Sequence, residues 1–149
     1  MLAGTISLTT PGAAVTENFN TLALSGTSST VPTGWDFLET GTNANTTYNT
    51  GTGSSNTGDT YSFGPSGSSE RAFGGLQSGS LVPTIGASFT NNTGATITSL
   101  AISYTGEQWR LGTLSRVDRL DFQISTNATS LNSGTWTDVD SLDFTAPIS

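Results

Sequence analysis

Apolar and polar residues alternate along several short stretches of this chain, which is the two-residue period of a half-buried β-strand. The clearest stretches are residues 96–104 and 117–125, in which apolar residues recur two apart. In the second stretch we expect Leu120, Phe122 and Ile124 to face the core. No stretch shows a convincing helical period. The pattern therefore predicts an all-β protein.

Shorter runs of the same kind predict further strands along the chain. They lie at residues 4–10, 15–22, 35–38, 60–63, 70–73, 85–89 and 136–144. Turn-forming residues separate the strands at intervals of about 8–12 residues, which is typical of an antiparallel β-sandwich. Residues 40–60 are almost free of aliphatic side chains and predict a long polar loop. We expect a single domain over residues 1–149.

The composition excludes several classes of function. Charged residues are 10% of the chain, against about 25% in a typical soluble domain, and the net charge is −7 with only four arginines as cations. This balance disfavours nucleic acids and anionic membranes as partners. The absence of His and Cys excludes a Ser-His-Asp triad and thiolate metal sites. Threonine and serine make up about a third of the chain, which favours a secreted or cell-surface β protein.

Five aromatic side chains are candidates for binding sugars, because a flat ring can stack on the apolar face of a pyranose. They are Trp35, Tyr48, Tyr61, Trp109 and Trp136. The alternative is that the tryptophans form the core, since a domain with few aliphatic residues needs its aromatic residues inside. Tyr48 lies in the polar loop, and we expect it to be the most exposed of the five.

A group of carboxylates near the end of the chain is a candidate calcium site. Asp138, Asp140 and Asp143 lie close together, and Glu17 lies on an early predicted strand. Calcium prefers six to eight oxygen ligands, several of them carboxylates, and the Asp-x-Asp spacing places two on one face of a strand. The alternative is a solvated acidic face that blocks edge pairing.

The arginines predict structural ion pairs rather than ligand recognition. Arg119 and Asp121 lie two residues apart on one face of a predicted strand, where they can pair. Arg110 follows Glu107 by three residues.

Catalysis by this chain is not expected. Glu107 with Glu39 or Glu70 offers the two carboxylates of a glycosidase, but nothing in the sequence shows that they face each other. The chain has no Gly-x-Ser-x-Gly nucleophile elbow, and without lysine it has no phosphate-binding loop of the Gly-x-x-x-x-Gly-Lys type.

Several short motifs resemble those of lectin-like jelly-roll modules, of the MAM-like and cleaved-adhesin-like kinds. The motifs are residues 17–22 (ENFNTL), 31–35 (VPTGW), 71–76 (RAFGGL), 106–110 (GEQWR) and 119–123 (RLDFQ). The resemblance spans nearly the whole chain and implies a concanavalin A-like jelly roll. It also implies a large secreted or surface protein of bacterial, largely cyanobacterial, origin. Such modules stand beside endonuclease/exonuclease/phosphatase-type domains or calcium-binding repeats.

Modules of this kind usually continue beyond a segment like residues 143–147. Because this chain stops at Ser149, we expect that the sandwich either lacks its last strands or receives them from another segment or chain. An unpaired sheet edge would favour association.

These observations together predict a non-catalytic extracellular module for binding or adhesion, with polysaccharide as its ligand. The first alternative is a structural unit that associates with a neighbouring chain or domain through an open sheet edge. The second alternative is an accessory domain of a secreted nuclease or other hydrolase. Calcium is the one cofactor expected.

Overall fold

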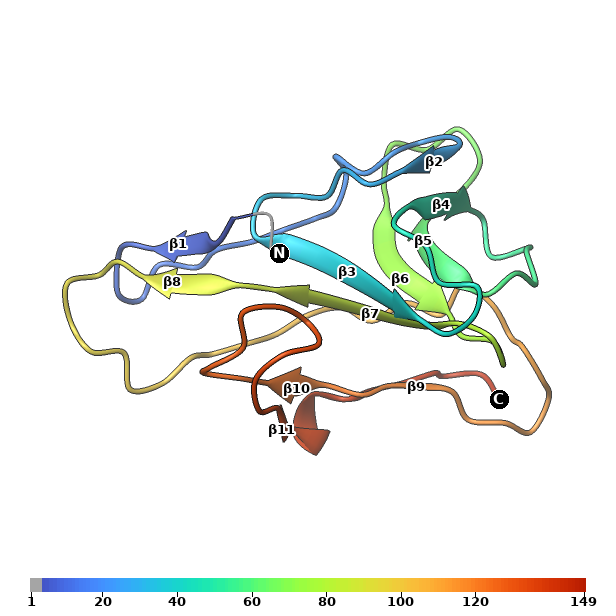
Figure 1. The fold of residues 1–149 in the computed structure, drawn as a ribbon. Helices are drawn as coiled ribbons and strands as arrows, with labels where there is room; N and C mark the ends of the chain where they lie inside the picture. The colour runs from blue at the N-terminus through green and yellow to red at the C-terminus, as the bar shows by residue number, and fades with distance from the viewer. Residues whose placement is uncertain (1–3) are drawn as a thin grey trace.

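The computed structural model describes residues 4–149 and is built of β-strands and loops, with one short 3-10 helix at Asp140–Leu142. The prediction of an all-β protein is confirmed. Figure 1 shows two long strands side by side in the middle of the molecule, with the largest sheet at one end. Within the described residues, no helix has the length and hydropathy needed to cross a lipid bilayer.

The largest sheet has four strands in the order β2, β4, β5 and β6. β5 (Asp59–Phe63) is buried along its whole length, between β4 (Tyr48–Gly51) and β6 (Ala72–Leu76). β6 is antiparallel to β5, but β4 runs parallel to it, and β2 (Thr27–Ser28) closes the sheet on the far side of β4. A central strand buried on both faces fixes the positions of all side chains along it.

A second sheet pairs β3 (Trp35–Thr40) with β7 (Val82–Ala87) in antiparallel register. β3 contacts β5, and β7 contacts both β5 and β6, so the two sheets pack against each other as in a sandwich. At the other end of the molecule β1 (Ile6–Leu8) runs parallel to β8 (Phe89–Asn91) (Figure 1). Two of the strand pairs are therefore parallel, whereas the other pairs among the described residues are antiparallel, as the turn spacing predicted.

The core between the sheets is aromatic. Tyr48, Phe73 and Leu22 are buried, with Phe19 and Phe37 packed against them. The rings meet edge to face, with centroids of Tyr48 and Phe73 5.8 Å apart and those of Phe37 and Tyr48 also 5.8 Å apart. Aromatic side chains supply the buried area that a chain with few aliphatic residues cannot obtain otherwise.

The second half of the chain departs most from the prediction. Residues 96–118 contain no strand, and Leu100 and Ile102 are exposed. Leu120 and Ile124, expected to face the core, are also exposed. A two-residue period determines which side chains share a face, but a strand also needs a neighbour to accept its backbone hydrogen bonds. The described residues supply such neighbours only to short stretches.

Those short stretches form two separate strand pairs. β9 (Arg119–Leu120) pairs with β12 (Phe144–Thr145), and β10 (Gln123–Ile124) pairs with β11 (Thr137–Asp138). The predicted strands at residues 117–125 and 136–144 are thus present only in part.

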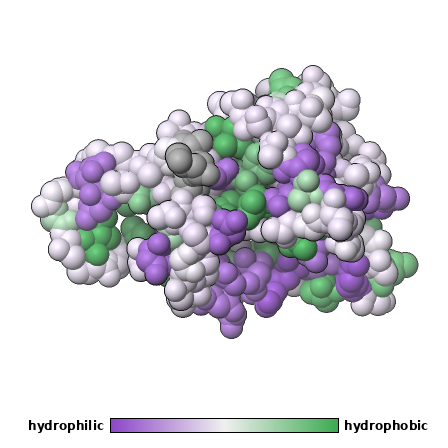
Figure 2. All heavy atoms as spheres, viewed as in Figure 1, coloured by the Kyte–Doolittle hydropathy of each residue, from purple (hydrophilic) through white to green (hydrophobic). Residues whose placement is uncertain are grey.

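Two expectations for the first half also change. Residues 15–22 form no strand, because Phe19 has a φ of 59°, which an extended strand does not allow, and the chain turns there. Residues 40–60 hold β4 and the start of β5, so strands interrupt the long polar segment. Figure 2 shows polar and weakly polar residues over most of one face, with apolar residues in patches between them.

Candidate functional site

Three aromatic rings form a continuous stack that begins in the buried sheet and ends near the surface. Tyr61 and Phe63 lie two residues apart on β5, so they share a face, and their ring centroids are 4.9 Å apart. The ring of Trp109 lies parallel to that of Phe63, with centroids 5.9 Å apart. Tyr61 and Phe63 are buried, whereas Trp109 is half-buried. Trp109 is therefore the accessible end of a rigid stack.

Polar side chains surround this accessible ring. The indole N–H of Trp109 donates a hydrogen bond of 2.9 Å to the carboxylate of Glu107. The guanidinium of Arg110 donates to the backbone carbonyl oxygens of Gly53 and Ser54 and to the side chain of Asn56. Residues 107–110 are thus tied to the loop between β4 and β5. A ring with polar groups beside it is the arrangement that sugar-binding sites require.

Gly53 permits this close approach of the two segments. Its φ is +82°, and a Cβ atom at this position would lie 1.8 Å from the carbonyl oxygen of Trp109. Any other residue would push residues 107–110 away from the β4–β5 loop.

Three of the other four aromatic candidates lie outside this stack. Tyr48 is fully buried, so the expectation that it is the most exposed is wrong. Its hydroxyl donates to the carbonyl of Thr30 and accepts from the backbone N–H of Ala23. Trp35 is half-buried, and Trp136 is 36% exposed and lies outside the stack.

Tyr61 belongs to the stack but cannot itself meet a ligand. It is 3% exposed, and its hydroxyl donates to the backbone carbonyl of Thr57. Burial therefore excludes direct stacking of a sugar on Tyr48 and Tyr61. Of the five candidate residues, Trp109 has the best combination of exposure, rigidity and polar neighbours.

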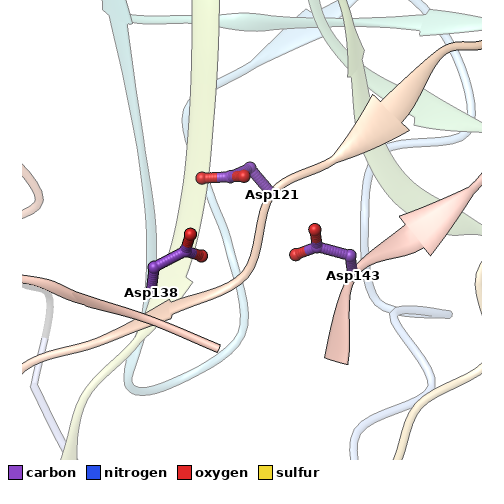
Figure 3. A group of neighbouring side chains, drawn as sticks. All are labelled: Asp121, Asp138 and Asp143. Atoms are coloured by element: carbon purple, nitrogen blue, oxygen red, sulfur yellow. The ribbon is translucent and has the colours of Figure 1, made fainter. Parts of the chain in front are cut away.

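Three aspartates gather near the end of the chain. One carboxylate oxygen from each of Asp121, Asp138 and Asp143 lies within 4.8 Å of the other two (Figure 3). Oxygen atoms at such spacing suit a hard cation such as calcium. Asp138 and Asp143 were expected from the sequence, whereas Asp121 was expected only as a partner of Arg119.

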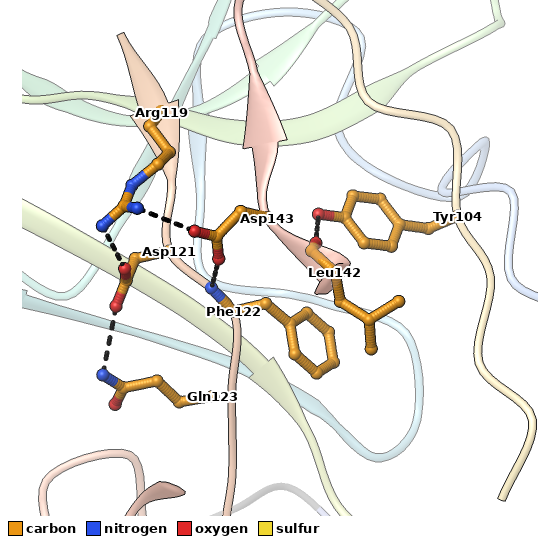
Figure 4. Close-up of polar contacts among 7 residues, drawn as sticks. All are labelled: Tyr104, Arg119, Asp121, Phe122, Gln123, Leu142 and Asp143. Carbon is orange, nitrogen blue, oxygen red and sulfur yellow. Dashed lines mark hydrogen bonds and ion pairs between the residues drawn. The ribbon is translucent and has the colours of Figure 1, made fainter. Parts of the chain in front are cut away.

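Arg119 already balances much of this negative charge. Its guanidinium lies 2.7 Å from Asp121 and 2.9 Å from Asp143, so the predicted pairing of Arg119 with Asp121 is confirmed (Figure 4). Asp143 is nearly buried and also accepts the backbone N–H of Phe122 at 2.9 Å. A cation here would share Asp121 and Asp143 with the arginine.

Asp138 differs from its two neighbours because it has no ion pair among residues 4–149. Partial desolvation and the nearby carboxylates of Asp121 and Asp140 raise its pKa. Asp140 is thus an electrostatic neighbour, although it is not one of the three clustered aspartates. Glu17 is not among them either: its carboxylate instead accepts the backbone N–H of Phe19 at 2.7 Å.

A further carboxylate pair involves Glu39, but its partner is neither Glu70 nor Glu107. Glu39 and Asp59 are both buried and both accept a hydrogen bond from the backbone N–H of Thr60. Asp59 could not be singled out from the sequence, because its proximity to Glu39 depends on how β3 crosses β5. A buried pair is not accessible to a substrate.

Comparison with protein-family models, curated proteins and solved structures finds no match to this chain.

Proposed function

We propose that this chain is a non-catalytic extracellular binding module that holds a neutral polysaccharide against the ring of Trp109. The observation that carries this proposal is the parallel stack of Tyr61, Phe63 and Trp109, which ends at the accessible indole. The resemblance to lectin-like jelly-roll modules supports the same function. Neutral sugars are favoured because a chain with a net charge of −7 repels anionic polymers.

The proposed mechanism combines a flat apolar contact with polar contacts at its edge. The C–H face of a pyranose would lie on Trp109, and sugar hydroxyls would exchange hydrogen bonds with Glu107, Arg110 and Asn56. Because β5 is buried, the ring is held in place before the ligand arrives, which reduces the entropic cost of binding. A single site of this kind binds weakly, and several copies on one surface or fibre would give useful avidity.

The test is binding of soluble neutral polysaccharides, a β-glucan, a mannan and a galactan, by affinity electrophoresis and calorimetry. Trp109→Ala should abolish binding to whichever polymer the wild type retains, whereas Trp136→Ala should leave it unchanged. Trp109→Phe, which keeps a ring on Phe63, separates loss of contact from loss of fold, and should bind with reduced affinity. Absence of binding to all three polymers, or loss of binding in Trp136→Ala alone, would overturn the proposal.

A second candidate function is assembly through a segment that has no backbone partner, and residues 96–105 favour it. Leu100, Ile102 and Tyr104 recur two apart and are exposed, and among the described residues this stretch has no backbone–backbone hydrogen bond. It also carries no charge, so a second copy can lie antiparallel to it without placing like charges opposite each other.

The assembly function predicts a dimer by analytical ultracentrifugation. Ile102→Lys would place like charges along the shared edge and should give a monomer, whereas Leu24→Lys, at another exposed site, should not. A wild type that stays monomeric at high concentration would contradict assembly and leave the polysaccharide proposal untouched.

A further inference from the structure

Two carboxyl groups are buried together at the point where β3 meets β5. Glu39 is 5% exposed and Asp59 is 4% exposed. One oxygen of Glu39 accepts both the backbone N–H and the hydroxyl of Thr60, each at 2.8 Å. An oxygen of Asp59 accepts the same backbone N–H, also at 2.8 Å. The two side chains therefore share one donor, and Glu39 links its own sheet to the neighbouring one.

Amide groups complete the hydrogen bonding around the pair. The second oxygen of Glu39 accepts the backbone N–H and the side-chain amide of Asn45, at 3.0 and 3.1 Å. The side-chain amide of Asn49 donates to Asp59. Glu39 thus also anchors the connection between β3 and β4, in which Asn45 lies.

Among residues 4–149, no arginine forms an ion pair with either carboxyl group. Leu76 lies opposite Asp59 on β6, and Pro83 lies opposite Glu39 on β7. β4 contributes Asn49, which is neutral. The negative charge of Glu39 acts on Asp59 and raises its pKa. Two carboxylates so close together, without a cation, cannot both be ionised at little cost.

The two groups respond to this environment in opposite directions. Burial, the hydrogen bond with Glu39 and its negative charge raise the pKa of Asp59 to about 6. Burial alone would raise the pKa of Glu39, but hydrogen bonds from Asn45, Asp59 and Thr60 outweigh it and lower the pKa below 4.5. The proton therefore resides mainly on Asp59, which donates it toward Glu39.

We propose that Glu39 and Asp59 hold a single proton between them and form a proton-dependent contact between the two sheets. This contact is most stable in mild acid and weaker toward neutral pH. The contribution of Asp59 to the free energy of unfolding is complete below its ordinary pKa of 3.8 and is lost as the pH rises through about 6. The contribution of Glu39 is complete above 4.5 and is lost as the pH falls through its lowered pKa. The contact between the two sheets is consequently most stable in mild acid.

The test is the melting temperature of the whole chain from about pH 4.5 to about 7.5. The wild type should lose several degrees as the pH rises. Asp59→Asn keeps an N–H donor toward Glu39 that cannot ionise, so its melting temperature should depend much less on pH. Glu70→Gln removes the same charge at an exposed position, so it should retain the wild-type slope and correct for the general charge of the protein.

A measurement on the wild type keeps the proposal testable if Asp59→Asn does not fold. The ¹³C resonance of the Asp59 carboxyl group should titrate with a midpoint of about 6. A midpoint near 3.8, or equal slopes for the wild type and a folded Asp59→Asn, would overturn the proposal.

Discussion

The indole ring of Trp109 lies at an angle of only 7° to the ring of Phe63, although the two residues belong to segments far apart in the sequence. Phe63 lies at the end of β5, which is buried along its length. Trp109 lies in a segment that has no strand of its own. The contact therefore gives residues 107–110 a fixed position that their own backbone pairing does not provide, and the proposed binding ring depends on it.

Removal of the supporting ring should be costly. Phe63→Ala leaves a cavity under Trp109 and should lower the free energy of unfolding by about 3 kcal/mol, measured by urea denaturation. Phe89→Ala is the matched control, because Phe89 is 51% exposed, and it should cost less than about 1 kcal/mol. Equal losses in the two variants would show that Phe63 is not a buried support.

Gly53 offers a second test of how Trp109 is positioned. Gly53→Ala places a Cβ against the carbonyl oxygen of Trp109, so it should lower both the melting temperature and any affinity for polysaccharide. Gly12→Ala is a close control, because Gly12 has a similar φ of +77° but no atom within 4 Å of the added Cβ. It should show only the backbone strain, about 1 kcal/mol. Equal melting temperatures for the Gly53→Ala and Gly12→Ala variants would contradict the close approach of the two segments.

The hydroxyl of Tyr48 should contribute to stability through its two backbone partners. Tyr48→Phe leaves the N–H of Ala23 and the carbonyl of Thr30 without that partner, and should cost about 1–3 kcal/mol in chemical denaturation. Tyr104→Phe removes one hydroxyl from a side chain that is 45% exposed, so its cost should be smaller. The reverse order would contradict the burial of Tyr48.

Calcium should stabilise the acidic group if a cation can share it with Arg119. Because Asp138 lacks an ion pair among the described residues, millimolar calcium should raise the melting temperature, and Asp138→Asn should remove that rise. Glu70→Gln should keep it. A wild type whose melting temperature does not respond to calcium would contradict calcium binding by these aspartates.

The sequence predicted β-strands correctly where a neighbouring segment pairs with their backbone. Alternation around Trp35 and around Tyr61 corresponds to β3 and β5, and the pairing of Arg119 with Asp121 follows from their two-residue spacing. Residues 96–104 alternate just as clearly yet form no strand. Alternation of apolar and polar residues is a property of one segment, whereas a β-strand also requires a second segment to pair with its backbone.

Contacts between distant segments could not be predicted in the same way. Tyr48 lies among polar residues, yet it is buried because its hydroxyl meets Ala23 and Thr30, which are 25 and 18 residues away. The proximity of Asp59 to Glu39 likewise depends on the crossing of two strands. The motif at residues 106–110 was visible in the sequence, but its support by β5 was not.

The most direct test of the proposed binding site is the fluorescence of Trp109 in a protein that carries Trp35→Phe and Trp136→Phe. Addition of the neutral polysaccharide that the wild type binds should shift the emission of this single tryptophan and reach saturation. The control protein carries Trp35→Phe and Trp109→Phe, so that Trp136 is its single tryptophan, and it should show no such shift. An unchanged Trp109 emission at saturating polysaccharide, or a saturable shift from Trp136 instead, would contradict the account.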